Sequence, residues 1–205
     1  MSSTYMHRVA PDEVRARIGE PDALTRMKKF GHIDAHVRRF IAHSPFLTMA
    51  TADAAGNADC TPRGDYPGFA KVLDERTLAI PDRPGNKLAD SFTNLAENDG
   101  IGLLFLIPGM IETVRVNGRA WVTDEPDVLA RMQTEASTPM LAIVVEVAEV
   151  YFHCGRALLR SRLWDADSQA LAAEAPTMAD VVADLVGGDV ETITKHVRAG
   201  YRELF

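Results

Sequence analysis

The sequence contains few cysteines and no long apolar segment, and both shortages limit the classes of protein it can belong to. Only Cys60 and Cys154 occur among 205 residues, too few for a disulfide framework, so a reducing compartment is expected. The longest apolar runs, such as Ile101–Ile107, are far shorter than the roughly 20 residues of a membrane-spanning helix. Residues 1–14 lack the apolar segment of a secretory signal. We therefore expect a cytoplasmic protein with no membrane partner.

Basic charge is also scarce. The chain has 22 Lys and Arg against 29 Asp and Glu, a formal net charge of -7. A protein that binds nucleic acid through its phosphates needs a basic stripe, so no nucleic-acid partner is expected. No segment matches the phosphate-binding loop of nucleoside triphosphatases or the glycine fingerprint of dinucleotide folds. His153-Cys154 has no second ligand pair at metal spacing, so no metal site is expected. Adjacent strand residues point to opposite faces, which also disfavours a Cys–His nucleophile pair.

The order of the predicted elements indicates a mainly β fold with added helices. No alternation of strand and helix is sustained, which favours an antiparallel barrel over a parallel sheet. The apolar run at 101–107 is typical of a strand buried on both faces. We expect one domain over 1–205, with its core at about 45–164. The patterns predict helices at 11–19, 34–43, 87–98, 124–133, 155–164, 180–185 and 191–204, and strands at 45–51, 58–62, 69–73, 77–81, 101–107, 112–122 and 141–152.

Two loops combine glycine with basic residues. The segment 61–65 places Arg63 beside Gly64, and arginine binds phosphate in a bidentate fashion. The segment 81–87 places Asn86 where it could cap a helix, with Lys87 in the first turn. A helix start attracts anions, and a cation there is unfavourable unless an anion lies nearby. The alternatives are a surface turn with a solvated arginine and a plain capped turn.

Two further segments contain polar side chains on one face of an element. Arg115 and Asn117 share a strand face, which is either a pocket lining or the wet side of a sheet. Arg156, Arg160 and Trp164 recur at helical spacing after His153-Cys154. That stripe suits an acidic ligand with an aromatic ring, or it is a basic surface helix with a tryptophan in the core.

Taken together, these segments resemble the pyridoxamine 5'-phosphate oxidase-like FMN-binding split barrels, and most closely an uncharacterised subgroup described as FMN- or F420-dependent. The resemblance covers about residues 45–164. The stretches that carry it are TPRGDYPG at 61–68, IPDRPGNK at 80–87, LLFLIPG at 103–109, TVRVNGR at 113–119 and HCGRALLRSRLW at 153–164.

The resemblance implies an antiparallel split β-barrel that forms a homodimer with two flavins, each held by both subunits. It assigns the FMN phosphate to Arg63 and Lys87, with Asn86 beside it. It places the isoalloxazine ring by the strand end that precedes the helix. The implied flavin site therefore contains Pro62, Arg63, Gly64, Asp65, Ile80, Pro81, Asp82, Asn86 and Lys87 from one subunit, and Arg160, Ser161 and Trp164 from the other.

The resemblance further implies a flavin-dependent oxidoreductase that acts on a small-molecule substrate or electron donor. The ending GYRELF at 200–205 lacks the arginine and histidine with which pyridoxamine 5'-phosphate oxidase holds pyridoxal phosphate, so a different substrate is expected. The flavin carries the redox chemistry, and no protein residue is assigned a catalytic role. The alternatives are a flavin carrier or redox sensor without turnover, and a pocket for F420 or haem.

Overall fold

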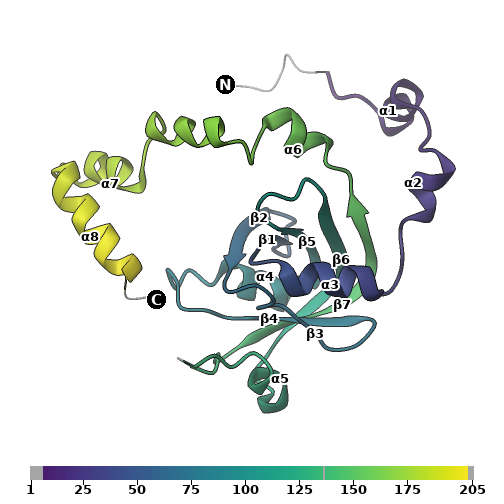
Figure 1. Ribbon diagram of the computed structural model, residues 1–205, viewed down its shortest axis with the longest axis horizontal. Helices are drawn as coiled ribbons and strands as arrows, with labels where there is room; N and C mark the ends of the chain where they lie inside the picture. The colour runs from purple at the N-terminus through teal and green to yellow at the C-terminus, as the bar shows by residue number, and fades with distance from the viewer. Residues whose placement is uncertain (1–6, 136, 203–205) are drawn as a thin grey trace.

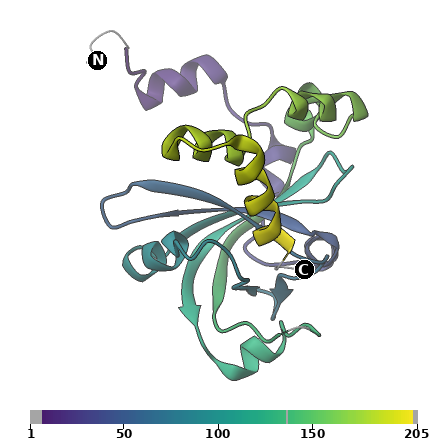
Figure 2. The same ribbon diagram turned by 90° about the vertical axis from the view of Figure 1, so that its left-hand side faces the viewer.

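The computed structural model describes residues 7–135 and 137–202, and its centre is one antiparallel sheet of seven strands (Figure 1). The strands follow the order β2-β1-β5-β6-β7-β4-β3, with β2 and β3 at the edges. The sheet is strongly curved but not closed, as in a split barrel (Figure 2). The predicted mainly β, antiparallel split-barrel fold is confirmed. The strands are β1 Phe46–Ala52, β2 Ala58–Gly64, β3 Lys71–Val72, β4 Thr77–Pro81, β5 Gly100–Leu106, β6 Thr113–Thr123 and β7 Ala142–His153.

Alternating apolar residues turn one face of this sheet into the core. Leu47 and Met49 of β1 and Phe105 of β5 are fully buried. Their intervening neighbours on β1 and β5 are half-buried or exposed. A strand places successive side chains on opposite faces, so this period of two directs one set of side chains inward.

The long strands β6 and β7 bend at one bulge. Their register shifts between Asn117 and Gly118. A Cβ on Gly118 would lie 2.0 Å from the carbonyl oxygen of Glu146, so β7 approaches β6 at a distance that only glycine permits. The bulge increases the local twist and helps the sheet to curve.

Two helices cover the sheet. In α3 (Ala35–His43), the N-cap Asp34 accepts a hydrogen bond of 2.8 Å from the amide of Val37. This helix buries Val37, Phe40 and Ile41 in the core. The helix α4 (Asp90–Glu97) contacts β1, β2 and β6 and buries Leu95.

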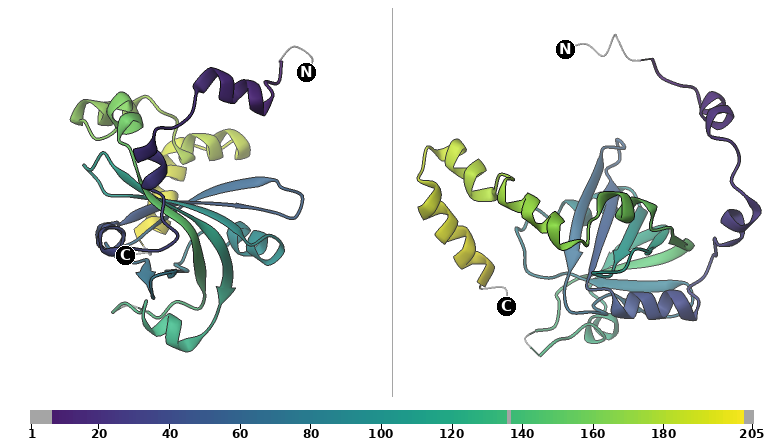
Figure 3. Two further views of the ribbon diagram at one scale, coloured as in Figure 1. Left: turned by 90° about the vertical axis from the view of Figure 1, so that its right-hand side faces the viewer. Right: turned by 45° about the horizontal axis from the view of Figure 1, so that its top comes forward.

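The remaining helices extend outward from the barrel, as Figure 3 shows from two sides. Near the N-terminus lie α1 (Pro11–Ile18) and α2 (Ala23–Met27), and α5 (Pro126–Ala130) follows β6. After β7 come α6 (Arg156–Ser161), a 3-10 helix (Ala166–Ala173), α7 (Met178–Val186) and α8 (Val190–Arg202). None of the described helices is long and apolar enough to cross a membrane.

Several sequence predictions about element boundaries were wrong. The helix expected at 87–98 begins at Asp90, because Lys87 and Ala89 have positive φ angles of 63° and 61°. The helix expected at 155–164 ends at Ser161, because Arg162 has a φ of 54°. The helix expected at 124–133 is limited to α5, and α2 and the 3-10 helix were not predicted. The predicted end of the last helix, at 204, lies outside the described residues. So do the last three residues of the ending GYRELF at 200–205.

The strand expected to be buried on both faces is buried on one. In β5, Ile101, Leu103 and Phe105 are buried, whereas Gly102, Leu104 and Leu106 remain half-exposed. Phe46, which pairs with Leu106, is 37% exposed. Within a single chain, β5 therefore has an apolar outer face that is incompletely covered.

Candidate functional site

Two arginines and two aspartates meet near the ends of β2 and β4, and we call Arg63, Asp65, Asp82 and Arg83 the arginine cluster. Arg83 Nε donates to Asp65 Oδ2 at 2.5 Å, and Arg83 Nη2 donates to the carbonyl oxygen of Met132 at 3.0 Å. Arg63 Nη1 lies 3.9 Å from Asp82 Oδ1. Because β2 and β4 lie near opposite edges of the sheet, its curvature is what brings these side chains together.

The cluster contains buried nitrogen atoms without an acceptor. Arg63 Nε and Arg83 Nη1 are both inaccessible to solvent, and neither has a hydrogen-bond partner among the described residues. A buried donor without a partner costs about 1–3 kcal/mol, and more when the group is charged. An anion placed against these nitrogens would supply the missing acceptors.

Burial also disfavours the charge on Arg63. Desolvation lowers the pKa of its guanidinium below the ordinary arginine value, and the attraction of Asp82 and Asp59 offsets part of that effect. Arginine nevertheless stays protonated in proteins. Its ion pair with Asp82 is at the outer limit of contact, so Arg63 is a desolvated cation that is only loosely paired.

The start of α4 lies against this arginine. The guanidinium carbon of Arg63 is 5.4 Å from the centre of the Phe92 ring, in the first turn of the helix. No side chain caps α4 at Ala89. The free backbone N–H groups at an uncapped helix start favour an anion. The cluster and the helix start thus both offer N–H donors, and the first turn of α4 also carries the acidic Asp90.

The predicted residues of the loop before α4 occupy different environments. Ile80 and Pro81 are buried at the end of β4, whereas Asn86 and Lys87 are exposed. Asn86 does not cap the helix, because it lies four residues before Asp90, and its Oδ1 instead accepts from the amide of Leu88 at 3.1 Å. Lys87 precedes the first turn rather than lying in it.

Other predicted residues are not brought to the cluster. Pro62 and Gly64 are exposed on the opposite face of β2 from Arg63. Arg160 and Ser161 lie on α6, on the far side of the sheet from β4 in Figure 1. Trp164 Nε1 donates to the carbonyl oxygen of Met110 at 2.8 Å. Because α6 ends at Ser161, Trp164 does not share a helix face with Arg156 and Arg160, as the sequence pattern had predicted.

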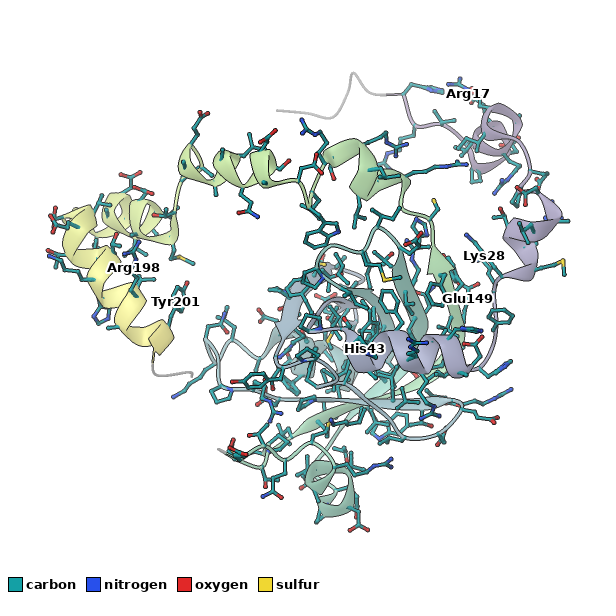
Figure 4. All side chains as sticks on the ribbon, in the orientation of Figure 1. Arg17, Lys28, His43, Glu149, Arg198 and Tyr201 are labelled. Carbon is teal, nitrogen blue, oxygen red and sulfur yellow. The ribbon has the colours of Figure 1, made fainter. Side chains whose placement is uncertain are left out.

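Arg115 and Asn117 line a polar patch on the outer face of the sheet. The sequence left open whether they line a pocket or lie on the wet side of a sheet. Arg115 Nη1 donates to Tyr151 Oη at 3.1 Å. Asn117 Nδ2 and Lys29 Nζ both donate to Glu149, at 3.1 and 2.7 Å. Figure 4 marks this region by Lys28 and Glu149. Both side chains are half-buried and bonded rather than simply solvated.

His153 lies at the end of the same patch. Its Nδ1 is buried and has no hydrogen-bond partner in the part of the chain that the structure describes. Burial, with smaller contributions from the charges of Arg115 and Lys28, lowers the pKa of this imidazole. The adjacent Cys154 is exposed.

Two residues of the site, Arg83 and Phe92, could not be predicted from the sequence. Arg83 belongs to the 80–87 stretch, but nothing local distinguishes it from a solvated loop arginine. Phe92 lies in the segment predicted as a helix at 87–98, and nothing in that pattern assigns it a contact with Arg63. Their roles depend on contacts with Asp65, Met132 and Arg63, which are distant in sequence.

Comparisons with known proteins identify the fold family. Residues 33–154 match the protein-family model described as pyridoxamine 5'-phosphate oxidase. No curated protein is significantly similar to the chain.

Similar solved structures include HupZ of Group A Streptococcus, with 17% identity and a TM-score of 0.49 over 58% of this chain and 93% of that one. A protein of Lactobacillus delbrueckii, provisionally named a pyridoxamine 5'-phosphate oxidase, has 22% identity and a TM-score of 0.46 over 61% and 99%. An FMN-binding protein of Syntrophomonas wolfei has 12% identity and a TM-score of 0.45 over 69% and 95%. These values are too low to support an argument about function. The family match spans more than half of the chain and includes the whole seven-stranded sheet, and on that evidence the chain belongs to the pyridoxamine 5'-phosphate oxidase family.

Proposed function

We propose that this protein binds FMN, with the phosphate held between Arg63 and the start of α4. The observation that carries the proposal is the buried Arg63 Nε, which lacks an acceptor while its guanidinium lies against the first turn of an uncapped helix. A phosphate dianion supplies several acceptor oxygens and two negative charges, which fit this donor set.

The other residues of the cluster would position the phosphate site. Arg83 links Asp65 to the carbonyl of Met132 and so holds the loop after β4 against the segment after β2. Lys87, exposed in that loop and without an ion pair among the described residues, is close in sequence to the helix start and would close over the phosphate. Ile80 and Pro81 would contact the flavin ring, and Asp82 would stay beside Arg63.

We further propose that the protein is a homodimeric oxidoreductase. Bound flavin supplies hydride and electron transfer, and the protein supplies binding, orientation and electrostatics. Within the described residues, no hydrogen bond or ion pair joins Arg160, Ser161 or Trp164 to the arginine cluster, which is compatible with contacts to a flavin on the second subunit. A cation such as Arg160 near the flavin would stabilise its reduced, anionic form. The substrate or electron donor would be a small molecule.

Titration of the purified protein with FMN, riboflavin and FAD tests the binding proposal. We expect FMN to bind most tightly, because riboflavin lacks the phosphate and FAD would place a dinucleotide in a site with one compact anion pocket. Equal affinity for FMN and riboflavin, or tighter binding of FAD, would contradict it. Parallel titrations with F420 and haem test the two alternative ligands.

Anaerobic mixing of the FMN-loaded protein with NADH, NADPH or reduced F420 separates an enzyme from a carrier. Bleaching of the flavin, followed by recovery with an oxidised acceptor, is expected for an oxidoreductase. FMN that binds but is reduced by none of these donors would favour the carrier or sensor alternative.

A further inference from the structure

A basic hollow is lined by residues of the segment that follows the arginine cluster in sequence. It has a volume of about 390 Å³ and is bounded by α3, by residues 67–72 and by Arg131 at the end of α5. Three of its lining residues are cations, namely Arg38, Lys71 and Arg131, and no carboxylate lines it. We call it the α3 groove. It does not contain Arg63 or any other residue assigned above to the flavin site.

The three cations of the α3 groove have no ion-pair partner within the described parts of the chain. Arg38 donates to two backbone carbonyls, those of Val72 and Asp74, both at 3.3 Å. Lys71 Nζ donates to the carbonyl oxygen of Gly68 at 2.8 Å. The pKa of Asp74 is lowered mainly because its Oδ1 accepts a hydrogen bond of 2.7 Å from the amide of Arg76, and the charge of Arg38 makes only the smallest contribution. In a chain of net charge -7, such a grouping of unneutralised cations is unexpected for a merely solvated surface.

The walls of the groove are held in place. Gly68 has a φ of 78°, and a Cβ there would lie 2.9 Å from the carbonyl oxygen of Ala42 in α3. The amide of Gly68 also donates to the carbonyl of Ser44 at 3.2 Å. Ile41, in the same lining, is fully buried in the core. The segment that carries Lys71 therefore packs directly on the helix that carries Arg38.

We propose that the α3 groove binds the phosphate group of a second small molecule, separate from the FMN phosphate. Two guanidinium groups and one ammonium group provide charge-assisted donors. A phosphate dianion, with more charge and more acceptor oxygens, suits them better as a ligand than a carboxylate does. The volume lies within the range of about 300–1,000 Å³ that is typical of small-molecule sites. The ligand class is a phosphate monoester, such as a phosphorylated substrate or effector.

The groove adjoins the arginine cluster at both of its walls. Residues 67–71 follow Asp65 by two residues, and Arg131 directly precedes Met132, whose carbonyl accepts from Arg83. A ligand that contacts these segments would therefore act on the same backbone that positions Arg83. A ligand in the α3 groove, next to the proposed flavin site, could therefore be a second reactant or a regulator of that site.

Calorimetric titration with inorganic phosphate, performed on FMN-saturated protein, tests the proposal with the flavin site already filled. We expect one phosphate site per chain, with weaker binding of acetate. Lys71→Met and Arg131→Gln should each weaken phosphate binding by about tenfold or more, because each removes a charge-assisted contact. Arg39→Gln is the matched control, since Arg39 is an exposed neighbour on α3 that does not line the groove, and it should leave the affinity unchanged.

The same titration on ligand-free Arg63→Ala protein separates this proposal from the FMN proposal. Phosphate binding that persists in Arg63→Ala and is lost in Lys71→Met supports the α3 groove whether or not FMN binds. Three outcomes would overturn the proposal. The first is loss of phosphate binding in Arg63→Ala, and the second is equal phosphate affinity in Lys71→Met and wild type. The third is that the wild-type protein binds no phosphate, whether FMN-saturated or ligand-free. Melting temperatures of the variants show whether each is folded, and Arg131→Gln, at an exposed position, provides a second variant should Lys71→Met unfold.

Discussion

At the scale of single residues, Arg63 combines features that a purely structural arginine seldom has. It is 20% exposed, one of its buried nitrogens lacks an acceptor, and its carboxylate partner is 3.9 Å away. Burying such a group without good partners opposes folding. A ligand that supplies acceptors would offset this cost.

The first prediction concerns the FMN phosphate. Arg63→Ala and Lys87→Ala should each weaken FMN binding by about tenfold to hundredfold, the equivalent of roughly 1.5–3 kcal/mol for a charge-assisted contact. Riboflavin binding should barely change, because riboflavin has the same ring and ribityl chain without the phosphate. Flavin fluorescence titration measures both affinities.

Arg119→Ala is a suitable control, since Arg119 is an exposed arginine in a surface ion pair with Asp99. It should bind both flavins as the wild type does. For ligand-free Arg63→Ala, urea denaturation should show a loss of no more than about 1 kcal/mol in the free energy of unfolding, because Arg63 is poorly paired. Equal losses of FMN and riboflavin affinity would refute the phosphate assignment.

At the scale of elements, the bulge between β6 and β7 controls the shape of the sheet. Gly118 allows the backbone of β7 to approach within a distance that a Cβ would forbid. The curvature that follows brings β2 and β4 close enough for Arg63 to reach Asp82. The geometry of the candidate site therefore depends on a glycine that does not belong to it.

The second prediction is that Gly118→Ala lowers the free energy of unfolding by at least about 3 kcal/mol, because the new Cβ overlaps the Glu146 carbonyl and the strands must separate. Gly102→Ala, on neighbouring β5, is the matched control. A Cβ there would meet Asn117 Oδ1 at 3.5 Å, an ordinary contact, so a change within about 1 kcal/mol is expected. Urea denaturation of both variants makes the comparison, and similar stabilities would show that the bulge tolerates a side chain.

At the scale of the whole molecule, apolar side chains remain exposed on the outer helices. Val181, Leu185 and Val186 of α7 are each at least 50% exposed, although α7 and α8 pack on each other. The outer face of β5 adds Leu104 and Leu106, together with Phe46. Exposed apolar side chains that gather on one surface often mark an interaction site, and the proposed second subunit would cover these.

The third prediction is a homodimer. Light scattering should give twice the chain mass of 22.4 kDa at micromolar concentration, since obligate dimers often bury more than about 2,000 Å². Phe46→Glu and Leu104→Glu should weaken the dimer, because each places a charge on the apolar outer face. A stable folded wild-type monomer at this concentration would contradict both the dimer and the two-subunit flavin site.

Much of the architecture could be predicted from the sequence because its causes are local. Apolar, β-branched or alternating runs between turn residues predicted β1, β4, β6 and β7 to within a few residues, and apolar residues at helical spacing predicted α3. Between β1 and β2, Gly56 has a φ of 83°, a left-handed conformation that glycine adopts readily in a turn. Helix ends were less predictable, because Lys87, Ala89 and Arg162 adopt positive φ angles that their residue types disfavour.

The composition and the order of the elements by themselves determined the mainly β, antiparallel fold class, and the segments at 61–68 and 80–87 led to the prediction of an anion site. The tertiary structure decided which side chains meet there. Arg83 joins Asp65 and Met132, and Arg63 contacts Phe92, because the sheet curves and α4 packs across it. The α3 groove also depends on contacts between α3, residues 67–72 and Arg131. Such contacts join residues far apart in the chain, whereas periodicity and turn chemistry act over a few residues and cannot specify them.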